Sequence, residues 1–299
     1  MSDTLPPEGA AFETTPFAVR VARDVVRVSG PDAVSFLQGQ LSQDIARLDV
    51  GACAWTFVLQ PQGKVDAWFR VTRLAEDEYL CDVDGGWGAA IVTRLQRFKL
   101  RVKVDIELLD WQCVAVRGVA ASAVDEVACG ALVAAPVEWV GTFGVDLLGS
   151  TVVVPQGVRE ADRLAYDTWR VAVGMPAMGA ELDESTIPAE AGVVDISVSF
   201  TKGCYTGQEL VARVDSRGNR TPRNLRRIVL PESRDDATFA SGAELLAGDG
   251  HPVGVLTSVA GALALAYVRR EVEPPAVVFI ASVGTGPGIE VAVEVLPAH

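Results

Sequence analysis

The chain is short of the residues from which metal centres and hydrolytic sites are usually built. It has two histidines, His251 and His299, and five cysteines in 299 residues, with no CxxC or CxC pair. A tetrahedral zinc site needs about four Cys, His or acidic ligands, and a Cys-His hydrolase needs a histidine beside its cysteine. Nothing near His251 resembles a catalytic segment, so the sequence disfavours both classes of site.

Signals for export, membrane insertion and nucleotide binding are also missing. Residues 1–16 are proline-rich and acidic, lack the basic and apolar regions of a secretory signal, and are expected to form a loose tail. The uncharged stretch from Val253 to Val268 is sixteen residues long and broken by Gly, Thr and Ser, which suits strands better than a membrane span. Neither GxGxxG nor a P-loop sequence occurs. Because no export signal is present and the cysteines are few and widely spaced, we expect a reduced, cytoplasmic protein. Because no stretch is long enough to span a membrane, we expect no membrane partner.

The composition is that of a globular protein, but its charge is unevenly distributed. Hydrophobic residues make up 49% and charged residues 22% of the chain, which carries a net charge of −13. The segment from Lys202 to Arg227, however, contains seven positive and two negative side chains. Its net charge is therefore +5, and that of the rest of the chain is −18. The segment is either a solvated basic surface or a local site for an anion, such as a phosphate, a carboxylate tail or RNA.

Hydrophobic periodicity predicts interleaved helices and strands, followed by an all-β region. Apolar residues at Val34, Leu37, Leu41 and Ile45 predict a helix whose polar face carries Gln38, Gln40, Gln43 and Asp44. The other predicted elements are a strand at 25–28, a hairpin of strands at 53–59 and 65–71, strands at 79–83, 102–108 and 111–116, helices at 87–100, 120–128 and 161–173, and mixed turn and strand at 179–200. After Pro222, short valine-rich runs alternate with Gly and Pro turns. We therefore expect a tail at 1–16, an α+β region at 17–222 and a β-barrel domain at 223–299.

The segment TKGCYTGQELVAR, from Thr201 to Arg213, places a cysteine just before a predicted helix start. Thr206 and Glu209 have the spacing of a capping box, which makes Thr206 the expected N-cap. A helix N-terminus and the neighbouring Lys202 would then favour the thiolate of Cys204. On this reasoning alone, Cys204 is either an accessible reactive thiol or an incidental residue of a glycine-rich turn.

The octapeptide KGCYTGQE, Lys202 to Glu209, closely resembles the signature of the YgfZ-type folate-binding proteins, which aid iron-sulfur cluster assembly or repair. Their relatives include mitochondrial iron-sulfur assembly factors and, more distantly, the T-protein (aminomethyltransferase) of the glycine cleavage system. The resemblance runs along most of the chain. It also rests on four further segments: FLQGQL at 36–41, QPQGK at 60–64, GAELD with IPAEAG between 179 and 192, and ALAYVRR at 264–270.

The resemblance implies a GcvT-like α+β fold of two intertwined subdomains and a C-terminal β-barrel around a central channel that binds tetrahydrofolate or a related folate. It makes Cys204 and Asp66 candidates for catalysis, although a surface charge on the hairpin is the favoured alternative for Asp66. The candidate cofactor-binding residues are Lys202, Tyr205, Gln208, Arg213, Tyr166, Arg170, Gln40 and Asp44. Tyr166 would stack on the folate, and Arg170 would pair with a carboxylate; a core position and a solvated guanidinium are the alternatives for these two residues.

Two positions depart from the T-protein pattern. Ala172 stands where T-proteins have a glutamate that holds the pterin, and Ala67 replaces the second of two paired aspartates, leaving Asp66. Alanine cannot accept a hydrogen bond, so aminomethyl transfer is disfavoured.

Three functions remain open at this stage. The first is a folate-dependent accessory factor for iron-sulfur proteins, in which Cys204 contacts a cluster transiently or does redox chemistry, with iron-sulfur client or carrier proteins as partners. The second is a folate-dependent one-carbon transferase, including methyl transfer to RNA, with Asp66 as base. The third is an RNA- or anion-binding module that uses the basic segment, for which tRNA is a candidate partner.

Overall fold

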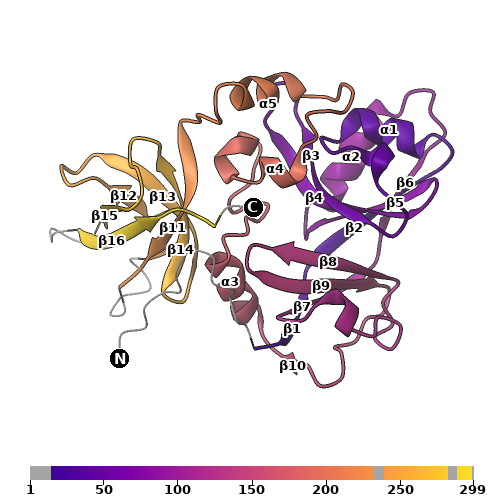
Figure 1. The fold of residues 1–299 in the computed structure, drawn as a ribbon, viewed down its shortest axis with the longest axis horizontal. Coiled ribbons are helices and arrows are strands. Elements are labelled where there is room, and N and C mark those ends of the chain that lie inside the picture. Colours follow the sequence, from indigo (N-terminus) through magenta and orange to yellow (C-terminus); the bar gives the residue numbers. More distant parts are fainter. Residues whose placement is uncertain (1–14, 232–238, 282–287, 298–299) are drawn as a thin grey trace. The chain divides into compact units, whose positions relative to one another are not determined.

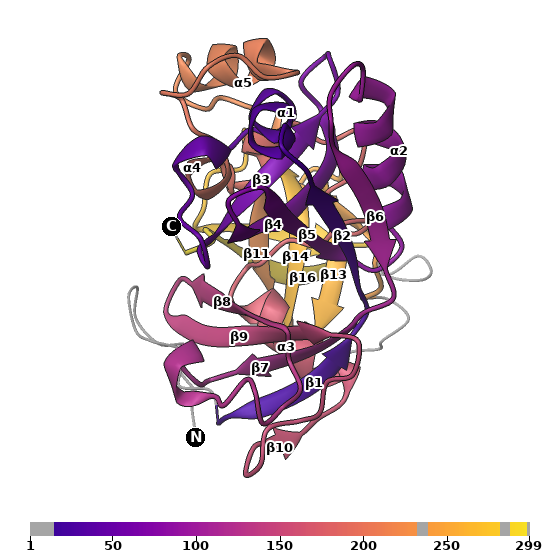
Figure 2. The same ribbon diagram turned by 90° about the vertical axis from the view of Figure 1, so that its right-hand side faces the viewer.

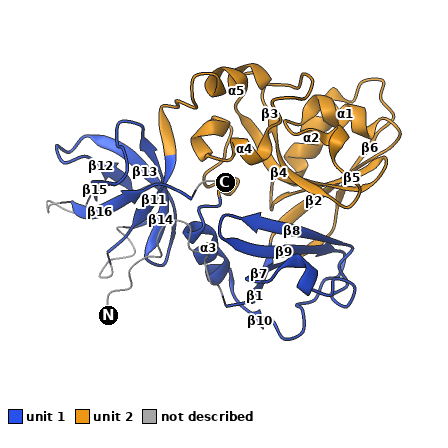
Figure 3. Ribbon diagram, viewed as in Figure 1, with its two compact units in different colours: residues 1–21, 114–175, 225–299 blue, residues 22–113, 176–224 orange. Residues whose placement is uncertain are grey.

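The computed structural model describes residues 15–231, 239–281 and 288–297, and the predicted tail at 1–16 lies almost wholly outside them. The chain divides into two compact units (Figure 3). Unit 1 comprises residues 1–21, 114–175 and 225–299, and unit 2 comprises residues 22–113 and 176–224. The chain therefore leaves unit 1, builds most of unit 2, and returns twice, so both units are made of segments distant in sequence.

Unit 2 is built on one antiparallel sheet with the strand order β3-β4-β5-β2-β6 (Figure 2). Its strands are β2 (Arg23–Ser29), β3 (Cys53–Leu59), β4 (Val65–Ala75), β5 (Glu78–Asp84) and β6 (Asp105–Leu109). The hairpin of β3 and β4 pairs Phe57 with Trp68 and turns through Gln60–Lys64, where the Gln60 N–H donates to the Lys64 carbonyl at 2.8 Å. Gly63 takes the left-handed φ of +81° that this turn needs.

Short helices accompany this sheet. They are α1 (Ala33–Gln40), η1 (Ile45–Arg47), α2 (Gly88–Phe98), η3 (Pro188–Ala191), α4 (Val194–Ser197) and α5 (Gln208–Asp215). In α1, Ala33, Phe36 and Leu37 are buried at the helical spacing, and in α2 the buried pair is Ile91 and Leu95. The stripe of apolar residues thus fixes which side of each helix packs inward.

Unit 1 contains a second five-stranded sheet, with the order β10-β1-β7-β9-β8 (Figure 1). Its elements are β1 (Phe17–Val21), β7 (Gln112–Arg117), η2 (Ala121–Ala123), β8 (Val133–Trp139), β9 (Thr142–Gly149), β10 (Arg159–Glu160) and α3 (Arg163–Ala172). Asp162 caps α3 by accepting the Ala165 N–H. A buried ion pair between Arg117 and Asp146, at 2.8 Å, lies on this sheet.

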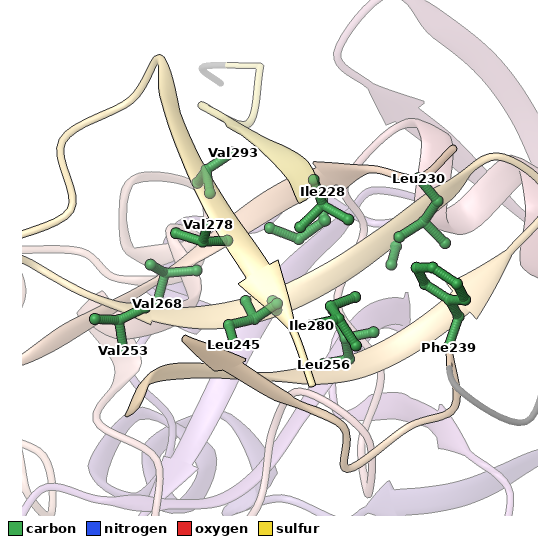
Figure 4. Close-up of a cluster of buried hydrophobic side chains, with 13 residues drawn as sticks. Ile228, Leu230, Phe239, Leu245, Val253, Leu256, Val268, Val278, Ile280 and Val293 are labelled. Carbon is green, nitrogen blue, oxygen red and sulfur yellow. The ribbon is translucent and has the colours of Figure 1, made fainter. Parts of the chain in front are cut away.

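The C-terminal strands of unit 1 close into a six-stranded barrel with the order β11-β14-β13-β12-β15-β16. They are β11 (Arg223–Val229), β12 (Glu244–Leu246), β13 (Pro252–Ala260), β14 (Leu263–Arg269), β15 (Ala276–Ile280) and β16 (Ile289–Glu294). Branched aliphatic residues, among them Ile228, Leu245 and Val278, fill the interior (Figure 4). The closed barrel has no open sheet edge. It confirms the all-β region predicted after Pro222.

The structure confirms the predicted α+β class and most of the predicted elements, and it corrects three. The helix expected to reach Ile45 ends at Gln40, because the Gln38 side chain accepts the N–H groups of Ile45 and Ala46 and turns the chain. The helix predicted at 120–128 is reduced to η2, in a segment with exposed Asp and Glu. The region 179–200 forms short helical turns rather than strands. Strands β1, β8, β9 and β10 had not been predicted.

Candidate functional site

Cys204 lies on the loop between α4 and α5, and it is the exposed member of the five cysteines. Cys81, Cys113 and Cys129 are buried, and Cys53 is half-buried. Burial raises the pKa values of Cys81 and Cys129 and keeps these thiols in the unreactive neutral form. The loop therefore offers solvent a thiol that the rest of the chain does not.

Helix α5 begins one residue later than its sequence indicates. Its N-cap is Gly207, with a left-handed φ of +83° and no side-chain cap, so the prediction that Thr206 is the N-cap is wrong. A Cβ on Gly207 would lie 2.5 Å from the Gln60 carbonyl oxygen and 2.7 Å from the Leu59 Cβ. The close packing of the helix start on the β3–β4 hairpin thus requires glycine at the cap. Cys204 accordingly lies four residues before Gln208, the first helical residue.

Lys202 ties the Cys204 loop to the end of α1. Its ammonium donates to the carbonyl oxygens of Gln38, Leu41 and Gln43 at 2.8, 2.7 and 2.8 Å. The last carbonyls of a helix lack intrahelical donors and favour a cation. All three N–H donors of Lys202 are used in this way, so its visible role is to hold the loop, and the predicted ligand contact of Lys202 stays a prediction.

Burial lowers the pKa of Lys202 to about 8, an effect that the nearby Asp44 carboxylate partly offsets. Asp44 accepts the side-chain amide of Gln38 at 3.0 Å. Three of the polar residues predicted on one helix face, Gln38, Gln43 and Asp44, therefore lie together at the turn after α1, where hydrogen bonds join them to one another and to Lys202. The fourth, Gln40, accepts from Arg94 instead.

Tyr205 and Gln208 complete the loop. The Tyr205 ring is buried, its centroid lies 5.2 Å from the Lys202 Nζ, and burial raises the pKa of its hydroxyl to about 12. The Tyr205 N–H donates to the Gln208 side chain at 3.1 Å. Arg213 is exposed on α5, and no side-chain hydrogen bond or ion pair engages it within the described part of the chain. Of these three candidates, Arg213 has the side chain most open to a partner.

A second polar cluster of unit 2 joins Asp66 to Gln40 through Arg94. The Arg94 Nε donates to the Asp66 Oδ2 at 2.9 Å, its Nη2 to the Leu59 carbonyl at 3.1 Å, and its Nη1 to the Gln40 Oε1 at 3.4 Å. The Arg94 guanidinium also lies 4.0 Å from the centroid of the Phe98 ring. Asp66 is thus an oriented carboxylate and not a loose surface charge.

This cluster borders a pocket of about 450 Å³. Its lining combines an apolar part with four charged side chains, and consists of Val58, Asp66, Ala67, Trp87, Ala89, Ala90, Ile91, Thr93, Arg94, Arg97 and Glu184. The volume is in the range of small-molecule sites, which are typically apolar with a few placed polar groups.

Tyr166 and Arg170 belong to unit 1, and both are buried. The guanidiniums of Arg117 and Arg163 each lie 5.4 Å from the centroid of the Tyr166 ring. Arg170 donates to the Met175 carbonyl at 3.0 Å and to the Ser258 Oγ at 2.7 Å. Both side chains thus have partners inside unit 1, and their predicted folate contacts remain predictions.

Sequence reasoning missed Arg94 and Trp87, which shape the pocket. A signal was present, because residues 94–103 contain five positive side chains and no acidic one. This stretch carries the same net charge of +5 as the segment at 202–227.

Neither a metal-binding group nor a membrane-spanning helix is found in the described ranges. No set of three or more His, Cys, Asp or Glu side chains there is placed to hold a metal ion. None of the helices described is long and apolar enough to cross a membrane.

Comparison with known proteins first defines the fold. The glycine cleavage system aminomethyltransferase T from Bartonella henselae superposes with a TM-score of 0.77 over 97% of this chain and 87% of its own, at 20% sequence identity. Residues 22–154 match the GCVT N-terminal domain. The architecture is therefore that of the aminomethyltransferases.

Sequence relatives then indicate the kind of protein that the chain resembles. The mitochondrial iron-sulfur cluster assembly factor IBA57 homolog of Neurospora crassa is 30% identical, with 66% of this chain and 50% of that protein covered. The tRNA-modifying protein YgfZ of Vibrio vulnificus is 26% identical, with 65% and 64% covered. The chain thus spans about half to two thirds of the length of these relatives. These similarities support a GcvT-like protein of the YgfZ/IBA57 type.

Proposed function

We propose that this protein is a tetrahydrofolate-binding accessory factor for the assembly or repair of iron-sulfur clusters, with the Cys204 thiol as its functional group. The observation that supports it most is the exposed thiol on a loop that three hydrogen bonds from Lys202 fix to α1. The names of its relatives, an iron-sulfur cluster assembly factor and a tRNA-modifying protein, agree with such a role.

The chemistry assigned to Cys204 is that of a transient ligand or transfer thiolate. Cluster iron is held by several cysteine thiolates, and one cysteine supplies a single ligand. A client or carrier protein, or a small thiol, must therefore complete the coordination. A redox role, in which Cys204 attacks a disulfide of a client, uses the same exposed thiol.

The residues present fit a folate. The unit 2 pocket has the volume for a bicyclic ring, an aromatic wall at Trp87, and the Asp66 carboxylate as acceptor. Folate would supply one-carbon or redox chemistry when bound. The protein residues would bind and orient it.

Calorimetry with tetrahydrofolate tests the ligand. We expect saturable binding that is unchanged in Cys204→Ser, because the thiol lies outside the pocket lining. Absence of any heat with the wild-type protein at millimolar ligand would refute the folate part of the proposal.

One-carbon transfer is the weaker alternative. Asp66, its candidate base, is paired with Arg94, and Ala67 and Ala172 remove two acceptors of the T-protein pattern. If the purified protein transferred a one-carbon group from folate to an acceptor, the one-carbon transferase function would be supported.

Contact with tRNA is a second candidate partner interaction. Arg213, Arg217 and Arg220 are exposed, and in the described ranges their side chains have no hydrogen-bond or ion-pair partner. Phosphate contacts make affinity fall steeply with salt, with a slope of about one per contact. We expect the double variant Arg217→Gln/Arg220→Gln to bind tRNA more weakly and to reduce the slope of affinity against salt by about two. Phosphate-mediated binding weakens between roughly 50 and 200 mM salt. Wild-type protein that binds no tRNA at roughly 50 mM salt would therefore exclude the contact.

A further inference from the structure

Strand β6 (Asp105–Leu109) is an open edge of the unit 2 sheet. It ends the strand order β3-β4-β5-β2-β6, so one side of it pairs with β2 and, among the described residues, no strand pairs with the other side (Figure 2). At the opposite edge, the chain after α1 lies on β3 and forms the Leu41–Val58 bridge. An open edge presents unpaired N–H and C=O groups, to which a further strand can be added.

The backbone groups that face the open side can be assigned from Lys103, just before β6. Its N–H donates to the Asp32 Oδ2 at 2.7 Å, and its carbonyl accepts the Asp32 N–H at 3.4 Å. Both groups of Lys103 therefore face the turn that follows β2. Because successive residues of an extended chain direct these groups to opposite sides, those of Val104, Ile106 and Leu108 face away from β2.

The side chains along this edge form an apolar row and a charged row. Ile106 and Leu108 lie opposite Val28 and Val26 of β2, on one face of the sheet. Val102 and Val104 continue this apolar row at the same alternate spacing. The other face carries three exposed charged side chains, those of Lys103, Asp105 and Glu107.

The sequence of this edge is complementary to itself about Val104. It reads LRVKVDIEL from Leu100 to Leu108, and residues at equal distances on either side of Val104 have opposite charges or are both apolar. Two copies can therefore lie antiparallel with the Val104 residues opposite each other. The facing pairs are then Lys103 with Asp105, Arg101 with Glu107, Val102 with Ile106 and Leu100 with Leu108.

Charge selects this register over its neighbours. Opposite charges that face each other across two strands stabilise a sheet, and like charges destabilise it. Pairing centred on Lys103 opposes two lysines, and pairing centred on Asp105 opposes two aspartates. Centres at residues 102 and 106 also oppose like charges. Of the five centres from 102 to 106, Val104 alone opposes unlike charges throughout.

The side chains of this edge are accessible to a second copy. Those of Lys103 and Arg101 have no hydrogen-bond or ion-pair partner in the part of the chain that the structure describes. Asp105 is 94% exposed, and its carboxylate lies 3.9 Å from the Lys99 ammonium. Leu100 is 77% exposed, an unusual position for a large apolar side chain that has no partner to cover it.

Arg101 sets the length of the regular pairing. Its φ of +59° is left-handed, so the extended chain begins at Val102. The hydrogen-bonded ladder would therefore extend from Val102 to Ile106 in each copy. The facing Arg101–Glu107 and Leu100–Leu108 side chains would flank it at both ends.

We propose that this edge binds a second copy of the chain, in an antiparallel ladder centred on Val104 that joins two unit 2 sheets into one. A two-fold interface uses the same patch on both copies, so each complementary pair occurs twice. Charged residues on an edge strand normally prevent such pairing. Here their order about Val104 favours one partner, which is the same segment reversed.

Sedimentation velocity of the full-length protein over a range of concentrations tests the pairing. We expect the wild type to dimerise reversibly by about 100 μM, as suits a small interface. Lys103→Glu places a glutamate opposite Asp105, and Asp105→Lys places a lysine opposite Lys103. Each single variant should therefore raise the dissociation constant of the dimer by about tenfold or more.

An equimolar mixture of the two single variants guards against loss of folding. In a heterodimer of Lys103→Glu with Asp105→Lys, unlike charges face each other at every pair again, so the mixture should dimerise about as tightly as the wild type. Asp49→Lys is the charge-matched control for Asp105→Lys, because Asp49 is exposed in the loop before β3, at the other edge of the sheet. It should dimerise as the wild type does.

Three results would overturn the pairing. The first is a wild-type protein that sediments as a monomer at every concentration. The second is a dimer that both single variants form as tightly as the wild type, which would place the interface elsewhere. The third is a mixture of the single variants that stays monomeric while the wild type dimerises.

Discussion

At the scale of single residues, the loop of Cys204 depends on Lys202 more than on the start of a helix. The KGCYTGQE segment identifies a cysteine near a helix, and that much is visible in the sequence. The partners of Lys202 are backbone carbonyls of Gln38, Leu41 and Gln43, about 160 positions away in the chain. No side-chain pattern records such partners, so the anchoring role could not have been predicted.

The depressed pKa of Lys202 gives a pH dependence with a defined sign. In the folded protein the pKa of the Lys202 ammonium is about 8, whereas the ordinary lysine pKa of 10.5 applies to the unfolded chain. Between pH 8 and 10.5 the unfolded chain binds more protons at Lys202 than the folded protein does. The contribution of Lys202 to the free energy of unfolding therefore increases as the pH rises through this range, and decreases as the pH falls back to about 8.

Comparison of the wild type with Lys202→Met isolates this effect. The difference in free energy of unfolding between the two, from urea titrations, should favour the wild type more at pH 10 than at pH 7. Equal differences at the two pH values would show that the Lys202 pKa is not depressed in the folded protein.

At the scale of elements, the sequence correctly predicted those helices and strands whose bounds depend on interactions between neighbouring residues. The hairpin of β3 and β4 follows from alternation and a Gly-containing turn, and its bounds were predicted nearly in full. The end of α1 and the start of α5 were each misplaced. In both cases a contact from elsewhere, the Gln38 side chain or the β3–β4 turn, outweighs the helical pattern.

Gly207 tests the packing of α5 on that hairpin. Gly207→Ala adds a Cβ 2.5 Å from a backbone carbonyl at a left-handed φ, and should lower the free energy of unfolding by about 2–4 kcal/mol. Gly218 also has a positive φ but no atom within 4 Å of a built Cβ, so Gly218→Ala should cost only about 1 kcal/mol. Equal losses in urea titrations would mean that strain in φ alone explains the Gly207 effect.

At the scale of the whole molecule, the α+β class and the closed C-terminal barrel were predictable, while the segments that make up each unit were not. Residues 225–299 group with residues 114–175, and Leu225, Leu265 and Tyr267 share a core with Val171 of α3. The domain boundary expected near residue 222 rests on the change from a mixed pattern to short valine-rich runs in the sequence. The shared core could not be predicted in this way, because it depends on contacts between segments that are distant in the sequence.

The function assigned to the molecule depends on a thiol that the fold leaves exposed and anchored. Cys53→Ser is the matched control for Cys204→Ser, because Cys53 is a half-buried cysteine of β3 in the same unit. Both variants change one sulfur to oxygen, and neither residue lines the pocket.

Complementation of a deletion strain, read out as the activity of an iron-sulfur enzyme, tests the central claim most directly. The wild type and Cys53→Ser should restore the activity, and Cys204→Ser should fail to restore it while binding tetrahydrofolate as tightly as the wild type. Full rescue by Cys204→Ser at wild-type expression would contradict the claim.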